Sequence, residues 1–401
     1  MSQKYPGGII SKTAPVTVGP VDGEGGSAPG VWTLTQALEL NKQNLWPKPV
    51  LPKELYSWGR NGSGELGLGN IVYRSSPTQV GALTTWSRVG GGNDFSVAIK
   101  TDGTMWSWGY NVNGRLGLND TVARSSPVQI GALTTWYQIA VGAIFCLAIK
   151  TDGTLWSWGG NGNGQLGLGD TANRSSPVQI GALTTWYQVA ADSNCVAIKT
   201  DGTLWSWGAN YGGSLGLNDT VYRSSPVQIG ALTTWSQISG GSSFNLAAKT
   251  DGTLWSWGYN GQGNLGLGDI ANRSSPVQVG ALTAWSRIAA GASHSLAIKT
   301  DGTFWSWGNG DQGRLGVSNY ADRSSPVQVG ALTTWYQVAA GGAFSLAIKT
   351  DGTLWSWGYN GFGQLGLSGT TNRNSPVQVG ALTTWSRIVG GASHTLALKT
   401  S

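Results

Sequence analysis

The sequence predicts an all-β protein: a seven-bladed β-propeller closed by both ends of a repeat region and preceded by an extended N-terminal arm with one short helix. The first observation is a repeat, because the stretch 151–159 returns throughout the chain. A period of this size indicates modules that bury apolar surface only against their neighbours. The second tryptophan of the stretch recurs every 50 residues, with one step of 49, at Trp58, Trp108, Trp158, Trp207, Trp257, Trp307 and Trp357.

The second observation is the strand pattern inside one repeat. Thr-Asp-Gly-Thr at 151–154 predicts a hairpin turn of type I′, since Asp-Gly readily adopts positive φ angles. Alternating residues on both sides, at 147–150 and 155–158, predict two strands. Residues 186–190 predict a third strand and 177–180 a fourth. Three or four short antiparallel strands in each of seven repeats are typical of a propeller.

The third observation concerns the ends of the repeat region. It opens at Leu55–Gly59 without the strand and turn that precede this segment elsewhere, and it stops at Leu396–Ser401 without the Asp-Gly turn that follows elsewhere. The two ends are complementary halves of one repeat. We therefore expect a seventh blade built jointly from both, which removes exposed sheet edges.

Composition indicates a folded protein without a strongly basic face. The 401 residues include 63 Gly and 22 Trp, and only 11% are charged, which suits tight turns and an aromatic core. The net charge of +6 comes largely from Arg and Lys at repeated positions, so we expect it to be spread around the ring and expect no nucleic-acid partner. No signal-peptide core or apolar run of membrane length is present. We expect Cys146 and Cys195 to be free thiols.

Residues 1–50 lie outside the repeat and predict a separate attachment arm before the propeller at 51–401. Gly and Pro dominate much of this arm, but a short helix is predicted at about 34–43 with Thr33 as its N-cap. Trp32 and Trp46 flank the helix and are candidate anchors. The alternative is an unattached tail.

The motifs of the repeat resemble a known family. Trp158 to Gly169, followed by Ser176 to Val178, and Gly291 to Ala297 look like the regulator of chromosome condensation repeat. The resemblance covers nearly all of residues 51–401 and implies a seven-bladed propeller. Members include an exchange factor for a nuclear small GTPase, and a secreted bacterial inhibitor of β-lactamases has a related ring. Their binding residues cannot be matched to positions of this chain.

The N-terminal segment has a resemblance of its own. Residues 5–11 and 28–37 look like the opening of structural proteins of tailed bacteriophages. This resemblance implies that the arm binds other virion proteins and that the protein is a virion component assembled in the host cytoplasm.

The repeats differ from one another mainly in the loop after Trp-Gly, and loops at strand ends form the rims of a propeller. Tyrosines beside small polar residues are favoured in recognition surfaces. The alternative is neutral drift. Candidate recognition residues are Arg60, Tyr110, Arg115, Tyr211, Tyr259, Arg314, Tyr359 and Phe362.

No pattern in the sequence indicates catalysis. His294 and His394 are isolated repeat residues, and no set of spaced carboxylates suggests a metal site. We expect no enzyme activity, no cofactor, no metal and no membrane insertion. The expected function is that of a phage virion structural protein, a tail fibre or a capsid decoration, whose propeller binds a host glycan or protein or neighbouring virion proteins, with homo-oligomerisation open. The alternative is a soluble protein-binding propeller that acts as an inhibitor or an exchange factor.

Overall fold

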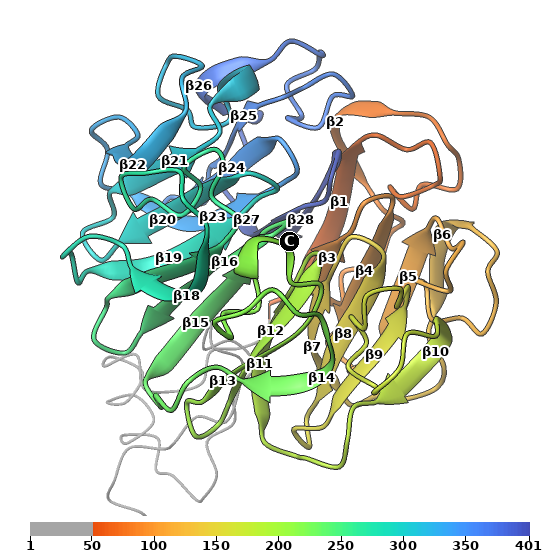
Figure 1. The fold of residues 1–401 in the computed structure, drawn as a ribbon. Helices are drawn as coiled ribbons and strands as arrows, with labels where there is room; N and C mark the ends of the chain where they lie inside the picture. Colours follow the sequence, from red (N-terminus) through yellow and green to blue (C-terminus); the bar gives the residue numbers. More distant parts are fainter. Residues whose placement is uncertain (1–50) are drawn as a thin grey trace, which may run out of the picture. The chain divides into compact units, whose positions relative to one another are not determined.

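A computed structural model describes residues 51–401, and the predicted helix at 34–43 and the anchors Trp32 and Trp46 lie outside this range. The described chain forms seven four-stranded antiparallel sheets arranged around a common centre (Figure 1). Two short 3₁₀ turns, η1 (Tyr211–Gly213) and η2 (Asp311–Gly313), are the only helical segments within residues 51–401. The predicted all-β, seven-bladed propeller is confirmed.

Each sheet is one blade, numbered here from the first complete sheet of the chain. The innermost strands, which pack against one another around the centre, are β3 (Trp86–Gly91), β7 (Trp136–Val141), β11 (Trp186–Ala191), β15 (Trp235–Gly240), β19 (Trp285–Ala290), β23 (Trp335–Ala340) and β27 (Trp385–Gly390). The second strands are β4 (Phe95–Lys100), β8 (Phe145–Lys150), β12 (Asn194–Lys199), β16 (Phe244–Lys249), β20 (His294–Lys299), β24 (Phe344–Lys349) and β28 (His394–Thr400).

The third strands carry the Trp-Ser-Trp-Gly motif or its Tyr-Ser-Trp-Gly variant. They are β5 (Met105–Gly109), β9 (Leu155–Gly159), β13 (Leu204–Gly208), β17 (Leu254–Gly258), β21 (Phe304–Gly308), β25 (Leu354–Gly358) and β1 (Lys53–Gly59). The outermost strands are β6 (Arg124–Gln129), β10 (Arg174–Gln179), β14 (Arg223–Gln228), β18 (Arg273–Gln278), β22 (Arg323–Gln328), β26 (Arg373–Gln378) and β2 (Arg74–Gln79). Blades 1 to 6 run in chain order from β3 to β26, and blade 7 consists of β27, β28, β1 and β2.

Blade 7 joins the two ends of the repeat region, as the sequence predicts. Strand β1 pairs antiparallel with β28 from Lys53 opposite Thr400 to Gly59 opposite His394. In Figure 1 the first and last colours of the described chain meet at this pair. The Lys399 ammonium group lies 2.9 Å from the Glu54 carboxylate across the junction. The ring is thus closed by a complete set of strand hydrogen bonds.

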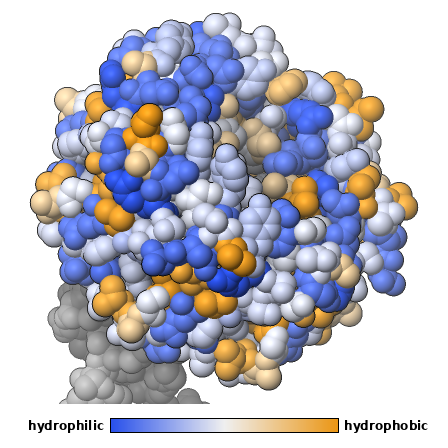
Figure 2. All heavy atoms as spheres, in the orientation of Figure 1, coloured by the Kyte–Doolittle hydropathy of each residue, from blue (hydrophilic) through white to orange (hydrophobic). Residues whose placement is uncertain are grey.

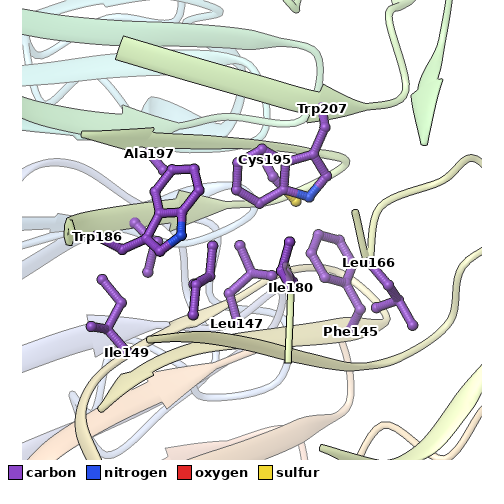
Figure 3. Close-up of a cluster of buried hydrophobic side chains, with 11 residues drawn as sticks. Phe145, Leu147, Ile149, Leu166, Ile180, Trp186, Cys195, Ala197 and Trp207 are labelled. Carbon is purple, nitrogen blue, oxygen red and sulfur yellow. The ribbon is translucent and has the colours of Figure 1, made fainter. Parts of the chain in front are cut away.

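The core lies between neighbouring blades, not within one. Figure 3 shows such a layer, in which Phe145 and Leu147 of blade 2 face Trp186, Cys195 and Trp207 of blade 3. Burying one indole removes about 150–250 Å² of surface, worth roughly 4–6 kcal/mol before the entropy cost of ordering the chain. Each blade therefore needs both neighbours to cover its apolar faces.

A repeated hydrogen bond links each blade to the next. The indole N–H of the buried Trp108 donates to the Glu65 carbonyl oxygen of the preceding loop at 2.9 Å, and the Ser96 hydroxyl donates to the same oxygen at 2.8 Å. The equivalent indole bonds at the other six junctions join Trp158 to Arg115, Trp207 to Gln165, Trp257 to Ser214, Trp307 to Asn264, Trp357 to Arg314 and Trp58 to Gln364. Cys146 and Cys195, both free and buried, occupy the position of Ser96 in their blades.

The hairpin turn differs from the predicted type I′. Among its residues only Gly153 has a positive φ, of 77°, whereas type I′ needs two such residues. The Gly153 N–H donates to the Lys150 carbonyl, which gives a type I turn followed by a left-handed glycine. The Asp152 carboxylate accepts bonds from the Thr154 N–H and hydroxyl at 2.9 and 2.6 Å, which fixes Asp152 without a positive φ. The predicted hairpin is therefore correct and its predicted turn type is wrong.

Candidate functional site

All long loops of the described chain lie at one end of the blades, here called the loop face. Third strands run toward this end, so the loop face carries seven long loops, 60–73, 110–123, 160–173, 209–222, 259–272, 309–322 and 359–372. The short turns between first and second strands, such as 92–94, lie at the same end. The opposite end, here called the hairpin face, carries the Thr-Asp-Gly-Thr turns and the blade-to-blade connections such as 80–85.

Differences between the blades concentrate on the loop face. The hairpin face repeats Thr-Asp-Gly-Thr in all six hairpin turns, and its Gly-Ala-Leu-Thr-Thr connection changes only at Ala284. Most of these residues are exposed, so exposure alone does not produce variation. The first residue of the long loop, in contrast, is Arg60, Tyr110, Gly160, Ala209, Tyr259, Asn309 and Tyr359 in turn.

A buried asparagine holds most of the long loops in one shape. The Asn111 side-chain amide donates to the carbonyl oxygens of Asp120 and Val122, both at 3.1 Å, and its oxygen accepts from the Leu116 N–H at 2.9 Å. The same set of bonds is made by Asn61, Asn161, Asn210, Asn260 and Asn360. The loops therefore present their variable side chains from a fixed backbone, which lowers the entropy cost of binding.

Three of the predicted tyrosines start their loops and lie beside the short turn of the same blade. The backbone N–H groups of Tyr110, Tyr259 and Tyr359 donate to turn carbonyls at 2.8, 2.8 and 2.9 Å. All three side chains are half-buried. Tyr211 is 59% exposed, and its ring centroid lies 5.6 Å from that of Tyr259 in the next blade. The two sets of variable residues, loops and turns, thus form one surface.

Phe362 is the centre of a cluster at the junction of blades 6 and 7. Its ring lies 5.9 Å from Tyr359 and 5.8 Å from Tyr73, both edge-on, and the Arg60 guanidinium lies 6.0 Å from its centroid. Arg60 also forms an ion pair with Asp94 of blade 1. The structure therefore brings three predicted residues together. Tyr73 was missed, although its equivalents Ala123 and Asn173 show that this loop position also varies.

Arg115 and Arg314 are placed beneath the loop face, where they are only 4% and 9% exposed. The Arg115 guanidinium lies 4.9 Å from the centroid of the Tyr110 ring, and the Arg314 Nε donates to the Asp311 carbonyl at 3.0 Å. Burial lowers the pKa of both guanidinium groups. The side chain at this repeat position points into the protein, since its equivalent in blade 7, Glu65, is fully buried.

Other features of the surface do not add a site. On the side drawn in Figure 2, hydrophobic residues lie in small separate groups among hydrophilic ones. Within residues 51–401 no three His, Cys, Asp or Glu side chains are grouped to hold a metal ion. In the same range no helix is long and apolar enough to cross a membrane.

The closed ring of repeated sheets defines a repeat-built β-propeller, and the comparisons with known families give it a more specific place. The RCC1-like domain model matches residues 187–401, more than half of the chain. Models of the regulator of chromosome condensation (RCC1) repeat match residues 54–99, 102–149 and 152–198. The chain belongs to the family of RCC1-like domain proteins.

Solved structures share the whole ring. Human WBSCR16 is 21% identical with a TM-score of 0.80, covering 87% of this chain and 99% of that one. Yeast RCC1 (Prp20) bound to Kap60 is 20% identical with a TM-score of 0.80, covering 88% and 90%. Prp20p from Saccharomyces cerevisiae, studied with its binding to Gsp1p and histones, is 21% identical with a TM-score of 0.78, covering 88% and 92%. At these identities the likeness shows the fold. No curated protein sequence matches the chain.

Proposed function

We propose that this chain is a protein-binding propeller that recognises its partner with the loop face and performs no chemical step. The observation that carries the proposal is that the loops of that face vary while the turns and connections of the hairpin face hardly change. The hairpin turns and blade connections are exposed and nearly identical between blades, whereas the exposed long loops differ, and they differ in Tyr, Phe and Arg. Aromatic and arginine side chains dominate the binding energy of protein interfaces.

The family supports the same proposal. Yeast Prp20 is described as bound to Kap60 and as binding Gsp1p and histones, so propellers of this family bind proteins. The proposal corresponds to the alternative that the sequence left open. A virion role rests on residues 1–50, which lie outside the described range, and it stays a prediction.

The test compares two sets of tyrosine substitutions at opposite ends of the blades. Tyr110→Ala, Tyr259→Ala and Tyr359→Ala together remove aromatic side chains from the loop face. Tyr187→Ala and Tyr336→Ala together form the control, because both tyrosines are exposed near the hairpin face. Each protein is immobilised, and the proteins it retains from the source culture are identified by mass spectrometry.

We expect the wild-type chain and the hairpin-face variant to retain the same partner and the loop-face variant to lose it. All three proteins should keep similar melting temperatures, because none of the substituted tyrosines belongs to the buried core between the blades. Loss of the partner from the hairpin-face variant alone would contradict the proposal.

A further inference from the structure

The repeated arginine at the start of each outermost strand is neutralised in only four consecutive blades. In blade 1 the Arg124 guanidinium forms an ion pair with Asp120, four residues earlier, at 2.6 Å. The same pair at the same distance joins Arg174 to Asp170, Arg223 to Asp219 and Arg273 to Asp269 in blades 2 to 4. The arginine is present in every blade, but its neutralisation by a carboxylate is not.

Blades 5, 6 and 7 keep the arginine but lack the aspartate. The residue four positions earlier is Asn319 before Arg323, Gly369 before Arg373 and Asn70 before Arg74. Within residues 51–401 none of these three guanidinium groups has an ion pair. Arg74 donates only to the neutral carbonyls of Val72 and Tyr73, at 3.3 and 3.2 Å, and Arg323 only to the Asn319 side chain at 3.4 Å. Three adjacent blades thus carry an arginine without an ion pair at the rim of the loop face.

Aromatic side chains accompany this charge. Tyr73 directly precedes Arg74 and is 45% exposed, and Tyr320 lies three residues before Arg323 and is 57% exposed. Tyr73 belongs to the Phe362 cluster described above. The loop of blade 6 lies along the start of β2, where the Ser368 N–H donates to the Ser75 carbonyl at 2.8 Å. Arg74 and the Phe362 cluster therefore lie in one blade junction.

We propose that an extended acidic segment of the partner protein binds along this rim, with its carboxylates on Arg74, Arg323 and Arg373. This inference rests on the proposed function and names the chemistry of the partner. Guanidinium groups bind carboxylates in a bidentate fork. One arginine per blade gives a row of separate charges, which suits an extended chain, and Tyr73 and Tyr320 provide apolar contacts between them.

Duplex DNA fits this rim less well. Proteins that bind DNA tightly neutralise on the order of 6–10 phosphates, whereas three unpaired arginines are present here. Asp311 and Asp322 lie on the loop of blade 5, and they would repel a continuous phosphate backbone. A short acidic peptide segment can place its few carboxylates between these charges.

The repeat supplies a matched control for the test. The rim variant combines Arg74→Gln, Arg323→Gln and Arg373→Gln. The control variant combines Arg124→Gln, Arg174→Gln and Arg273→Gln, which removes the same number of arginines at equivalent positions where each is ion-paired. The probe is a fluorescently labelled peptide of about ten residues, rich in glutamate with one tyrosine, and its binding to the full chain is measured by anisotropy at low salt.

We expect the rim variant to bind the peptide at least about tenfold more weakly than the wild type, and the control variant to differ by less than about twofold. Equal loss in both variants would overturn the proposal, since the charge would then act without regard to position. Tighter binding of a DNA duplex of about 20 base pairs, lost in the rim variant, would also overturn it in favour of nucleic acid. If the peptide fails to bind while the loop-face tyrosine variant still loses its natural partner, the acidic segment is wrong and the proposed function stands.

Discussion

Cys146 holds a position at which five of the seven blades carry an oxygen or nitrogen donor. Its sulfur lies 3.7 Å from the Arg115 carbonyl oxygen, whereas the Ser295 hydroxyl lies 2.7 Å from its own acceptor. We predict that Cys146→Ser increases the free energy of unfolding by about 1 kcal/mol, because the hydroxyl forms the shorter and stronger bond. Denaturant unfolding measures this. Cys146→Ala is the control, and a serine variant no more stable than the alanine variant would contradict the prediction.

Two buried histidines, His294 and His394, should make the free energy of unfolding depend on pH. Each replaces the phenylalanine found at this position in blades 1, 2, 4 and 6. The His294 ring forms a hydrogen bond with the Ser345 hydroxyl of the next blade, and the His394 ring forms one with the Ser96 hydroxyl, both at 3.0 Å. Burial lowers the pKa of His294 to about 3 and of His394 to about 4. Below the ordinary pKa of 6.5 the unfolded chain therefore binds protons that the folded chain does not.

We predict that the free energy of unfolding falls between about pH 6.5 and pH 4, by up to about 1.4 kcal/mol per pH unit for each histidine. Burial raises the pKa of Asp192 to about 6, so this carboxyl acts in the opposite direction as the pH falls. The double variant His294→Phe, His394→Phe should lose most of the acid sensitivity. Denaturant unfolding of both proteins at pH 7 and pH 5 measures how far the free energy of unfolding falls with pH. An equal fall in the wild type and the double variant would contradict the assignment to the histidines.

The sequence predicted the location of the candidate recognition residues better than their exposure. Tyr110, Tyr211, Tyr259 and Tyr359 lie on the loop face, as their place after Trp-Gly predicts. Arg115 lies only five residues after Tyr110, but the loop doubles back and puts it under that ring. No periodicity exists in such a loop, so the direction of a side chain depends on glycine conformations that the sequence pattern does not specify.

At the level of the turn, the structure separates two glycines with the same backbone conformation. Gly153 in the hairpin turn has φ of 77° and Gly181 in the blade connection has φ of 60°. An added Cβ at Gly153 would lie 2.2 Å from the Thr184 carbonyl oxygen, whereas one at Gly181 would meet nothing within 4 Å. The first position therefore adds a steric clash to the left-handed strain.

We predict that Gly181→Ala destabilises the protein by about 1 kcal/mol, the cost of left-handed alanine alone, and that Gly153→Ala destabilises it by roughly 3 kcal/mol or more. Thermal unfolding of the two single variants measures the difference. Similar melting temperatures would mean that the connection through Thr184 moves away without cost, and would contradict the prediction.

The hairpins also show where the sequence was sufficient and where it was not. Asp-Gly between alternating strands predicts each hairpin turn between a second and a third strand of the described chain, and the tryptophan spacing predicts every blade. Asp-Gly alone is compatible with a type I′ turn and with a type I turn followed by a left-handed glycine. The second type depends on the Asp152 carboxylate, which accepts two bonds from Thr154.

At the scale of the whole molecule, the ring is closed by the two ends of the repeat region, so its stability should depend on strand β1. This strand pairs with both β2 and β28, and Trp58 on it is fully buried against blade 6. We predict that a chain beginning at Arg60 loses cooperative unfolding, because blades 1 and 6 lose the neighbour that covers them. A chain beginning at Leu51 retains β1 and is the control. Calorimetry compares the two, and equal transitions would contradict the role of the closing strand.

Two bonds between neighbouring blades repeat in the same arrangement at every junction of the ring. Each loop lies on the outermost strand of the next blade, and each buried indole donates back to the loop before it, so the last blade contacts the first as any blade contacts its successor. Lys53 lies opposite Thr400, so a short peptide would connect the two ends of the repeat region. Cutting the joined chain in any connection of the hairpin face would then yield a circular permutant with the same ring. Such a permutant would present the same loop face, whichever blade its chain begins in.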